Sequence, residues 1–146
     1  MIKEACDLFA PLAEDKNIDF DKVIEDQIFI IADTKMFQRV VSNLLDNAIK
    51  YTPQNGRINV IVRQENHYIT IKIEDTGIGI DKKYLKKIFQ RFYRAESSRT
   101  TAGTGLGLSL ARTIVRQHKG EIQVTSHPGR GSVFIIRLPY NNPGVI

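Results

Sequence analysis

The chain of 146 residues is the size of one ordinary domain and is long enough to bury a hydrophobic core. Its composition, 42% hydrophobic and 25% charged, is typical of a soluble globular protein, and no apolar run approaches the roughly 20 residues that a membrane-spanning helix needs. The N-terminus shows no signal-peptide pattern, and the single cysteine, Cys6, excludes a disulfide within the chain, which is consistent with a reducing compartment.

The net charge of +5 hides an asymmetry between the two halves of the chain. Residues 1–80 carry nine Lys and Arg against thirteen Asp and Glu, whereas residues 81–146 carry twelve against three. A basic run opens the second half, and such a run is usually solvated surface, or a nucleic-acid site when aromatics are interleaved. Because this one lies between two glycine-rich stretches, a polyphosphate ligand or an acidic partner surface is equally expected. Among the partners of the chain we predict no nucleic acid. The run consists of Lys82, Lys83, Lys86, Lys87, Arg91, Arg94 and Arg99.

The first elements are a helix and two short strands. Residues 2–16 have the apolar spacing of an amphipathic helix, which we expect Pro11 to break. Ile18 and Phe20 alternate with polar residues as in a strand, and residues 27–32 predict a second, more apolar strand.

A long helix is predicted from Thr34 onward. Asp33 stands where an N-cap belongs, and Thr52 ends the helix because a residue before proline is pushed out of the α region. At 100° per residue, one apolar stripe faces a core; its members are Val40, Val41, Leu44 and Ala48.

Asn43, Asn47 and Lys50 form a column beside that stripe, because residues at i, i+4 and i+7 stack on one helix face. Such a column is usually solvated surface. Two asparagines argue against that interpretation, since Asn is a mediocre helix former whose side chain competes for backbone groups. The column therefore predicts the rim of a pocket.

A hairpin follows the long helix. Residues 58–62 and 69–73 alternate strictly between apolar and polar residues, and Asn66 and His67 suit the connection between two strands. The second strand runs directly into Asp75, Gly77 and Gly79. A carboxylate there is a strong acceptor, and the glycines allow close approach to a planar ligand, although a plain Asp-x-Gly turn has the same sequence.

The rest of the chain predicts two helices and two strands. Residues 82–89 predict a short basic helix, and residues 90–102 form a polar segment with few core candidates, which we expect to be mobile. A helix beginning after residues 103–107 should end with Gly120 as its C-cap. The last strands are predicted at 121–126 and 132–138.

This order of elements predicts an α+β two-layer sandwich, in which helices cover one face of a mixed, mostly antiparallel five-stranded sheet. We expect one domain over residues 1–140 and a loose tail over 141–146.

Gly103, Gly105 and Gly107 precede a helix, so free backbone N–H groups and the positive end of the helix dipole can meet phosphate oxygens. The spacing is neither the dinucleotide fingerprint nor a P-loop, and the serine/threonine kinase motifs are absent.

Four segments together resemble the catalytic ATP-binding domain of sensor histidine kinases, which has the Bergerat fold. They are similar, in order and spacing, to the family's N box, first glycine box, F box and second glycine box. The matching segments are residues 43–52, 75–80, 89–94 and 103–108. The resemblance extends over about residues 2–139.

The resemblance implies ATP and Mg²⁺ as ligands. Asn47 would ligate Mg²⁺ through its carboxamide oxygen, as suits a hard cation, and Asn43 and Lys50 would hold the phosphates. Residues 90–102 would form a lid that closes over the nucleotide.

On the adenine side, the resemblance implies that Tyr51 packs beside the base and that Asp75 accepts a hydrogen bond from its exocyclic amino group. Gly77, Gly79 and Ile80 would form the wall of that pocket.

On the phosphate side, Arg94 is similar to the family's lid arginine that reaches the γ-phosphate. The backbone cradle would come from Thr104, Gly105, Leu106 and Gly107. Catalysis would then rest on Asn43, Lys50 and Arg94, which act by positioning and charge neutralisation.

Asn43 also distinguishes among branches of the superfamily. Its ATP-hydrolysing relatives, of the gyrase, Hsp90 and MutL type, place a glutamate four residues before the Mg²⁺-binding asparagine. A neutral amide cannot act as a general base, so the phosphoryl group should wait for an external nucleophile. Asp46 is nearby, but we expect it to pair with Lys50 at the surface.

The phosphorylated histidine of the family is not recognisable here. In the family this histidine is followed by an acidic residue and shortly by a proline, a pattern that none of His67, His118 and His127 meets, so each is expected to be an ordinary surface histidine. The resemblance therefore implies a histidine-bearing dimerisation domain on the same or a partner chain and, indirectly, a response regulator.

The resemblance implies a cytoplasmic location, as the intracellular part of a membrane-anchored sensor kinase. We expect no membrane segment in this chain itself. An anti-sigma-type serine kinase, a non-hydrolytic ATP-binding switch and a superfamily ATPase remain as alternatives.

Overall fold

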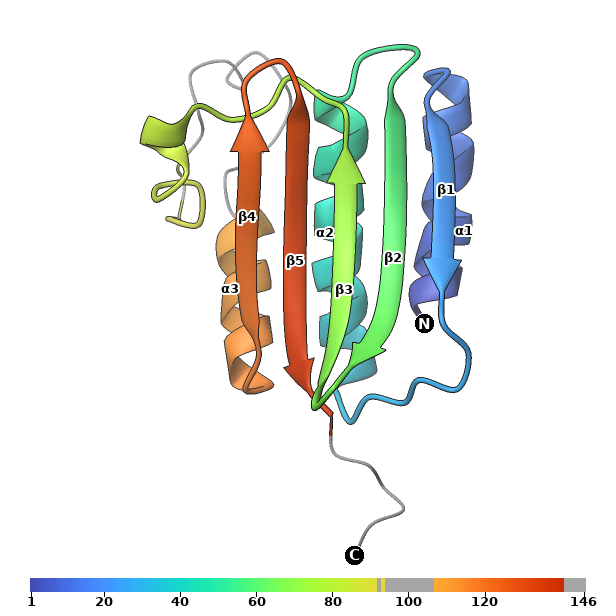
Figure 1. The fold of residues 1–146 in the computed structure, drawn as a ribbon, viewed down its shortest axis with the longest axis vertical. Helices are drawn as coiled ribbons and strands as arrows, with labels where there is room; N and C mark the ends of the chain where they lie inside the picture. Colours follow the sequence, from blue (N-terminus) through green and yellow to red (C-terminus); the bar gives the residue numbers. More distant parts are fainter. Residues whose placement is uncertain (92, 94–106, 141–146) are drawn as a thin grey trace, which may run out of the picture.

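The computed structural model describes residues 1–91, 93 and 107–140. Within these ranges the elements are α1 (Ile2–Asp15), β1 (Asp19–Ile24), α2 (Thr34–Tyr51), β2 (Arg57–Glu65), β3 (Tyr68–Asp75), the 3-10 helix η1 (Lys82–Tyr84), α3 (Gly107–Gln117), β4 (Glu121–His127) and β5 (Gly131–Pro139). The five strands form one sheet in the order β1-β2-β3-β5-β4, and the three α-helices lie on one of its faces (Figure 1). The predicted fold class is confirmed.

The sheet is mixed because β1 runs parallel to β2, whereas β2–β3, β3–β5 and β4–β5 are antiparallel. Every second residue of the central strands points toward the helices and is buried, as the alternating pattern predicts. These core residues are Ile58, Val60, Val62, Ile69, Ile71, Ile73, Phe134, Ile136 and Leu138.

Helix α2 lies behind the middle of the sheet and runs along its strands (Figure 1). The Asp33 carboxylate accepts a hydrogen bond from the Met36 N–H at 3.0 Å, so the predicted N-cap is confirmed. The helix ends at Tyr51, before Thr52, as the following proline requires. The predicted apolar stripe is buried throughout, namely Val40, Val41, Leu44 and Ala48. Phe37 and Leu45 of the same helix are buried as well.

The predicted strand at 27–32 is wrong. This segment carries no strand pairing and crosses from β1 to the start of α2. Gln27 has a φ of +61°, which interrupts an extended chain. Phe29 and Ile31 are 68% and 80% exposed, whereas Ile28, Ile30 and Ala32 pack against the core, so this apolar run is a loop with one side against the core.

Pro11 does not break the first helix, because α1 continues through it to Asp15. Proline removes one N–H donor, and here it lies on the exposed side of the helix, where water can bind the carbonyl left without a partner.

The predicted basic helix at 82–89 is wrong in kind. A single 3-10 turn, η1, follows Asp81, whose side chain accepts from the Lys83 N–H at 3.0 Å, and separate turns continue the segment. Four lysines crowded onto two helical turns repel one another and disfavour a regular helix.

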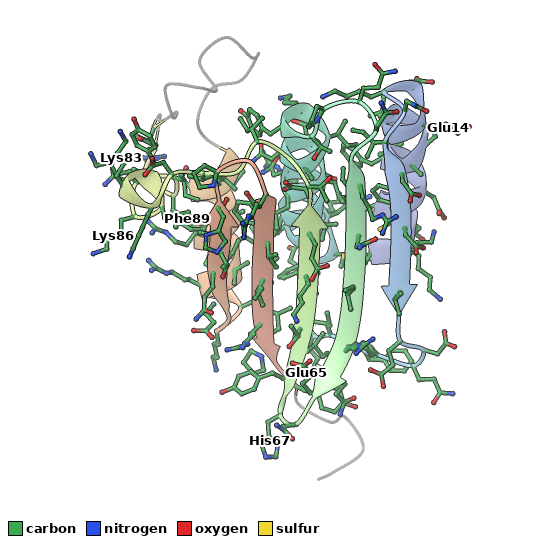
Figure 2. All side chains as sticks on the ribbon, turned by 45° about the horizontal axis from the view of Figure 1, so that its top comes forward. Glu14, Glu65, His67, Lys83, Lys86 and Phe89 are labelled. Carbon is green, nitrogen blue, oxygen red and sulfur yellow. The ribbon has the colours of Figure 1, made fainter. Side chains whose placement is uncertain are left out.

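The segment is fixed to the body of the protein by Ile88 and Phe89, which are 7% and 8% exposed. The Phe89 ring packs edge-on against the Phe134 ring, with 6.5 Å between the ring centroids. Lys83 and Lys86 extend from the outer side of the segment (Figure 2).

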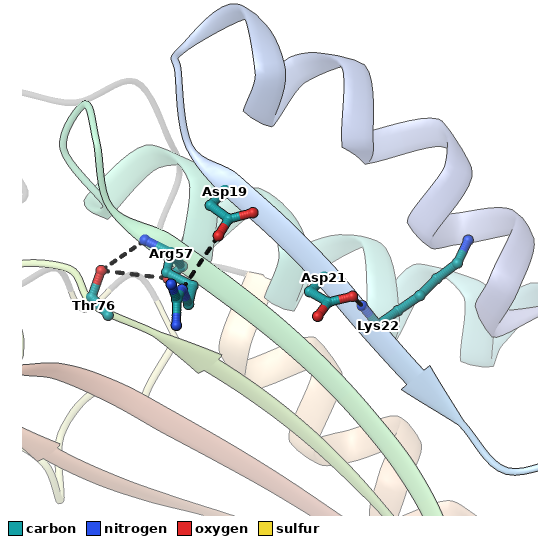
Figure 3. Close-up of polar contacts among 5 residues, drawn as sticks. All are labelled: Asp19, Asp21, Lys22, Arg57 and Thr76. Carbon is teal, nitrogen blue, oxygen red and sulfur yellow. Dashed lines mark hydrogen bonds and ion pairs between the residues drawn. The ribbon is translucent and has the colours of Figure 1, made fainter.

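The start of β2 is tied to its two neighbours. The Arg57 N–H donates to the Thr76 hydroxyl at 2.8 Å, and its guanidinium lies 3.4 Å from the Asp19 carboxylate (Figure 3). The Thr76 N–H in turn donates to the Arg57 carbonyl at 3.0 Å. These bonds fix the chain immediately after Asp75, the last residue of β3.

No helix among the described residues is long and apolar enough to cross a membrane. The boundary at residue 140 stays a prediction, and the predicted tail lies outside the described residues.

Candidate functional site

The C-terminal end of α2 meets the loop that follows β3. The Ile78 N–H donates to the Tyr51 carbonyl at 3.0 Å, and a Cβ on Gly77 would lie 2.5 Å from that same oxygen. Only glycine allows this approach without a shift of the backbone. The structure thus brings Tyr51 next to Asp75 and Gly77, which follow it in the sequence by 24 and 26 residues.

Asp75 is held by backbone donors from two sides. Its Oδ1 accepts from the Gly77 N–H at 2.8 Å and from the Ser132 N–H at 3.2 Å. Burial raises the pKa of the Asp75 carboxyl, and the two backbone hydrogen bonds oppose that rise only in part. No described residue donates to Oδ2, so a fixed acceptor is left for a ligand.

The predicted column on α2 lies at the edge of the core, since Asn43, Asn47 and Lys50 are all half-buried. The Asn43 amide donates to the Gly107 carbonyl at 3.3 Å, which brings the first residue of α3 to this rim. Lys50 forms an ion pair of 2.8 Å with Asp46, as predicted for that carboxylate. Lys50 must therefore leave Asp46 to reach a ligand.

The Asn47 side chain makes no hydrogen bond to any residue of the described ranges 1–91, 93 and 107–140. A half-buried carboxamide oxygen is a ligand of the type that Mg²⁺ accepts, and Oδ2 of Asp75 is an acceptor of the type that an amino group needs. The side chains present fit a nucleotide with its metal.

Gly79 and Ile80 are set by the hairpin between β4 and β5. Gly79 has a φ of +72°, and a Cβ on it would overlap the His127 carbonyl. The Ile80 N–H donates to the Ser126 hydroxyl at 2.7 Å. The sequence signalled only a turn between two strands here, so Ser126 and Ser132 were missed as parts of the site.

His118 is not the ordinary surface histidine that the sequence predicts. Its Nδ1 lies 2.8 Å from the Ile114 carbonyl, and its Nε2 accepts from the Asp33 N–H at 3.1 Å. Its ring also packs edge-on against Phe37 at 5.5 Å. It joins the end of α3 to the start of α2.

Several predicted site residues lie outside the described part of the chain. They are Arg94, Thr104, Gly105 and Leu106, together with most of the predicted lid at 90–102.

Comparison with known proteins gives one consistent result. Residues 32–142 match the family described as Histidine kinase-, DNA gyrase B-, and HSP90-like ATPase. The chain is 37% identical over 142 residues to the sensor histidine kinase RppB of Synechocystis, and 38% identical over 135 residues to CusS of Escherichia coli. These matches cover 95% and 91% of this chain but only 31% and 28% of the relatives, so the chain spans about a third of their length.

Solved structures agree with this result. The catalytic domain of the histidine kinase ThkA, in a nucleotide-free form, superposes with a TM-score of 0.84 at 30% identity and covers 97% of this chain and 92% of its own. The mycobacterial sensor histidine kinase MprB gives 0.83 at 30% identity, with 94% and 95% covered.

Proposed function

Because this chain belongs to the histidine kinase-, DNA gyrase B- and HSP90-like ATPase family, we propose that it is the ATP-binding catalytic part of a sensor histidine kinase. It transfers the γ-phosphoryl group of ATP to a histidine on a separate dimerisation domain, from which a response regulator takes it. Residues 1–140 perform this role in the cytoplasm.

The observation that carries the proposal is the geometry of Asp75. Two backbone N–H groups hold Oδ1, so the direction of Oδ2 is fixed, and it accepts the exocyclic amino group of adenine. Tyr51 packs beside the base, and Gly77, Gly79 and Ile80 line the pocket.

The rim of α2 binds the triphosphate. Asn43 and Lys50 bind phosphate oxygens together with Arg94 and with the backbone of residues 104–107. Asn47 ligates Mg²⁺, which neutralises phosphate charge when bound.

Transfer is favoured over hydrolysis by the chemistry of the rim. Asn43 is neutral and donates its amide to Gly107, so it cannot take a proton from water. Asp46, the carboxylate of that helix, directly precedes Asn47, so at 100° per residue its side chain points away from that of Asn47. The phosphoryl group therefore stays on ATP until an acceptor histidine arrives.

Calorimetric titration with Mg·ATP tests the binding half of the proposal. Asn47→Ala should weaken Mg·ATP binding at least about tenfold, a loss of one charge-assisted contact of about 1.4 kcal/mol. Gln38→Ala removes an exposed carboxamide from the same helix and should leave the affinity unchanged. Equal affinity in both variants would remove Asn47 from the site.

Phosphoryl transfer is tested with a separate histidine-bearing dimerisation domain and Mg·ATP labelled in the γ-phosphate. Acid-labile phosphate on that domain supports the proposal. Acid-stable phosphate on an acceptor would identify a serine kinase instead, and tight binding without transfer would identify a binding switch.

A further inference from the structure

The hairpin between β4 and β5 forms a support behind the adenine side of the site. We infer that Ser126 is a positioning residue for base recognition: its hydroxyl holds this hairpin against the loop 77–80 and thereby fixes the orientation of the Asp75 carboxylate. The inference rests on the proposed function, because it concerns how ATP is recognised.

Ser126 is 7% exposed, and all the hydrogen-bonding capacity of its hydroxyl is used. It accepts from the Ile80 N–H at 2.7 Å and donates to the Gly131 carbonyl at 2.9 Å. The Ser132 hydroxyl lies 2.8 Å away and is the donor of that pair, since the hydrogen of Ser126 is engaged with Gly131. One side chain thus joins the glycine loop to both ends of the turn.

Close packing of backbone on backbone surrounds this bond. The Gly129 N–H donates to the Ile78 carbonyl at 2.8 Å, so the tip of the hairpin is bonded to the same loop. A Cβ on Gly131 would overlap the Asp75 carbonyl. There is no room for the hairpin to slide, and a shift at Gly131 moves the end of β3.

Ser126 is linked to Asp75 through a short chain of hydrogen bonds. Gly131, which accepts from Ser126, precedes Ser132, whose N–H donates to Asp75 Oδ1. On the other side, Ile80 closes the loop whose Gly77 N–H donates to the same oxygen. Ser126 therefore acts on both donors that orient the Asp75 carboxylate.

The test compares ATP with purine riboside triphosphate, the ATP analogue that lacks the exocyclic amino group. The unaltered 146-residue chain should bind ATP about tenfold more tightly than the analogue, the worth of one hydrogen bond to a charged acceptor. In Ser126→Ala the affinity for ATP should fall about tenfold and that for the analogue less than about twofold, so the preference for ATP is lost.

Thr125→Ala is the matched control, because Thr125 is the exposed neighbour of Ser126 on β4 and should leave both affinities unchanged. Ser132→Ala keeps the Ser126 bonds to Ile80 and Gly131 and should keep most of the preference. An equal loss of ATP and analogue in Ser126→Ala would reveal general loosening and overturn the inference, as would no loss. An unaltered chain that binds neither ligand would overturn the proposed function itself.

Hydrogen exchange on the unaltered chain tests the same inference if Ser126→Ala does not fold. The amides of Ile80 and Ser132 should both exchange more slowly when ATP is added, and less so with the analogue. Exchange at Ile80 that does not respond to ATP would contradict the positioning role.

Discussion

Asp75 carries its charge in surroundings that oppose it. Burial raises the pKa of the carboxyl in the folded chain, so the folded state binds a proton more tightly than the unfolded state does. The contribution of this group to stability is therefore complete in acid, below the pKa of the unfolded chain, and is lost as the pH rises through the higher pKa of the folded state.

Asp75→Asn should consequently be at least as stable as the unaltered chain at neutral pH, because its amide oxygen still accepts from Gly77 and Ser132. Its advantage in free energy of unfolding should shrink as the pH falls, whereas Mg·ATP binding should be lost. Urea unfolding over a pH series, with calorimetry at neutral pH, measures both quantities. A variant that is less stable at neutral pH and keeps its affinity would contradict this account.

Thr52 presents the opposite case, a buried group without a partner. Among the described residues, its Oγ1 is the single buried side-chain nitrogen or oxygen that lacks a hydrogen bond. Thr52→Val should raise the free energy of unfolding by about 1 kcal/mol, because it removes an unpaired hydroxyl and keeps the shape. Valine also suits the extended backbone there, with φ −96° and ψ 120°.

Thr70→Val is the control for Thr52→Val. Thr70 is 4% exposed, but its hydroxyl donates to Glu65 Oε2 at 3.0 Å, so the same change should lower the free energy of unfolding by about 1 kcal/mol. Urea unfolding of the two variants should give shifts of opposite sign. A lower free energy of unfolding in both variants would show that the Thr52 hydroxyl has a partner.

Lys119, which follows the end of α3 by two residues, has a strained backbone conformation. Its φ of +58° belongs to the left-handed region, its N–H donates to Arg116, and the Gly120 N–H donates to Val115. The sequence predicts Gly120 as the C-cap, but the residue that adopts the left-handed conformation after this helix is Lys119. Gly120 is still required, since a Cβ there would lie 2.6 Å from the Arg137 carbonyl.

Lys119→Gly should raise the free energy of unfolding by about 1 kcal/mol, since glycine adopts this conformation without a steric penalty. Lys119→Ala keeps the steric penalty and removes the charge, and it should change stability by less than about 0.5 kcal/mol. Thermal unfolding separates the two effects. A gain of equal size in both variants would assign it to charge.

For the helices and strands, the periodicity of the sequence predicted which face of each element is buried. It did not predict which segments pair or which single polar contacts join them. The buried positions of α2, β2 and β3 repeat at 3.6 or 2 residues, so the pattern alone shows which side faces the core. The apolar run at 27–32 also predicts a strand, but it pairs with no strand in the part of the chain that the structure describes, and the pattern of one segment carries no information about pairing.

The support of the site was harder to predict than its rim. Asn43, Asn47 and Lys50 share one helix, so their alignment follows from helical geometry. Ser126 reaches Ile80 from a strand 46 residues away, and no local spacing encodes that contact. The same holds for Lys16, whose ammonium binds the Ile49 carbonyl at 2.8 Å at the end of α2.

Helix α1 is an element whose attachment can be measured through its single thiol. Cys6 is fully buried, and burial raises its pKa to about 11, so a neutral thiol is shielded while α1 stays in place. Ile2→Ala should speed labelling of Cys6 about tenfold by easing local opening, with no change in Mg·ATP affinity. A change in affinity with no change in labelling would couple α1 to the site instead.

On the scale of the whole molecule, acidic and basic residues are segregated along the chain. The exposed cations of the segment 82–91 lie beside the edge strand β4, whereas α1 and β1, at the opposite edge, carry much of the acid (Figure 2). Such a dipole orients an approaching charged partner and loses strength as salt is added. The acidic residues that make up this dipole do not serve as a base for hydrolysis, since the α2 side of the candidate site is lined by two amides and a lysine.

The isolated chain should therefore bind Mg·ATP and leave it intact. A positioned general base contributes about 10²- to 10⁴-fold to a reaction rate, and Asn43 offers none. Phosphate released by the unaltered chain, followed over hours, should not exceed that from Asn47→Ala by more than about tenfold, because no base on α2 is placed to activate water. Release at many turnovers per minute without an acceptor would place the chain among the ATPases of its superfamily and would require a base other than residue 43.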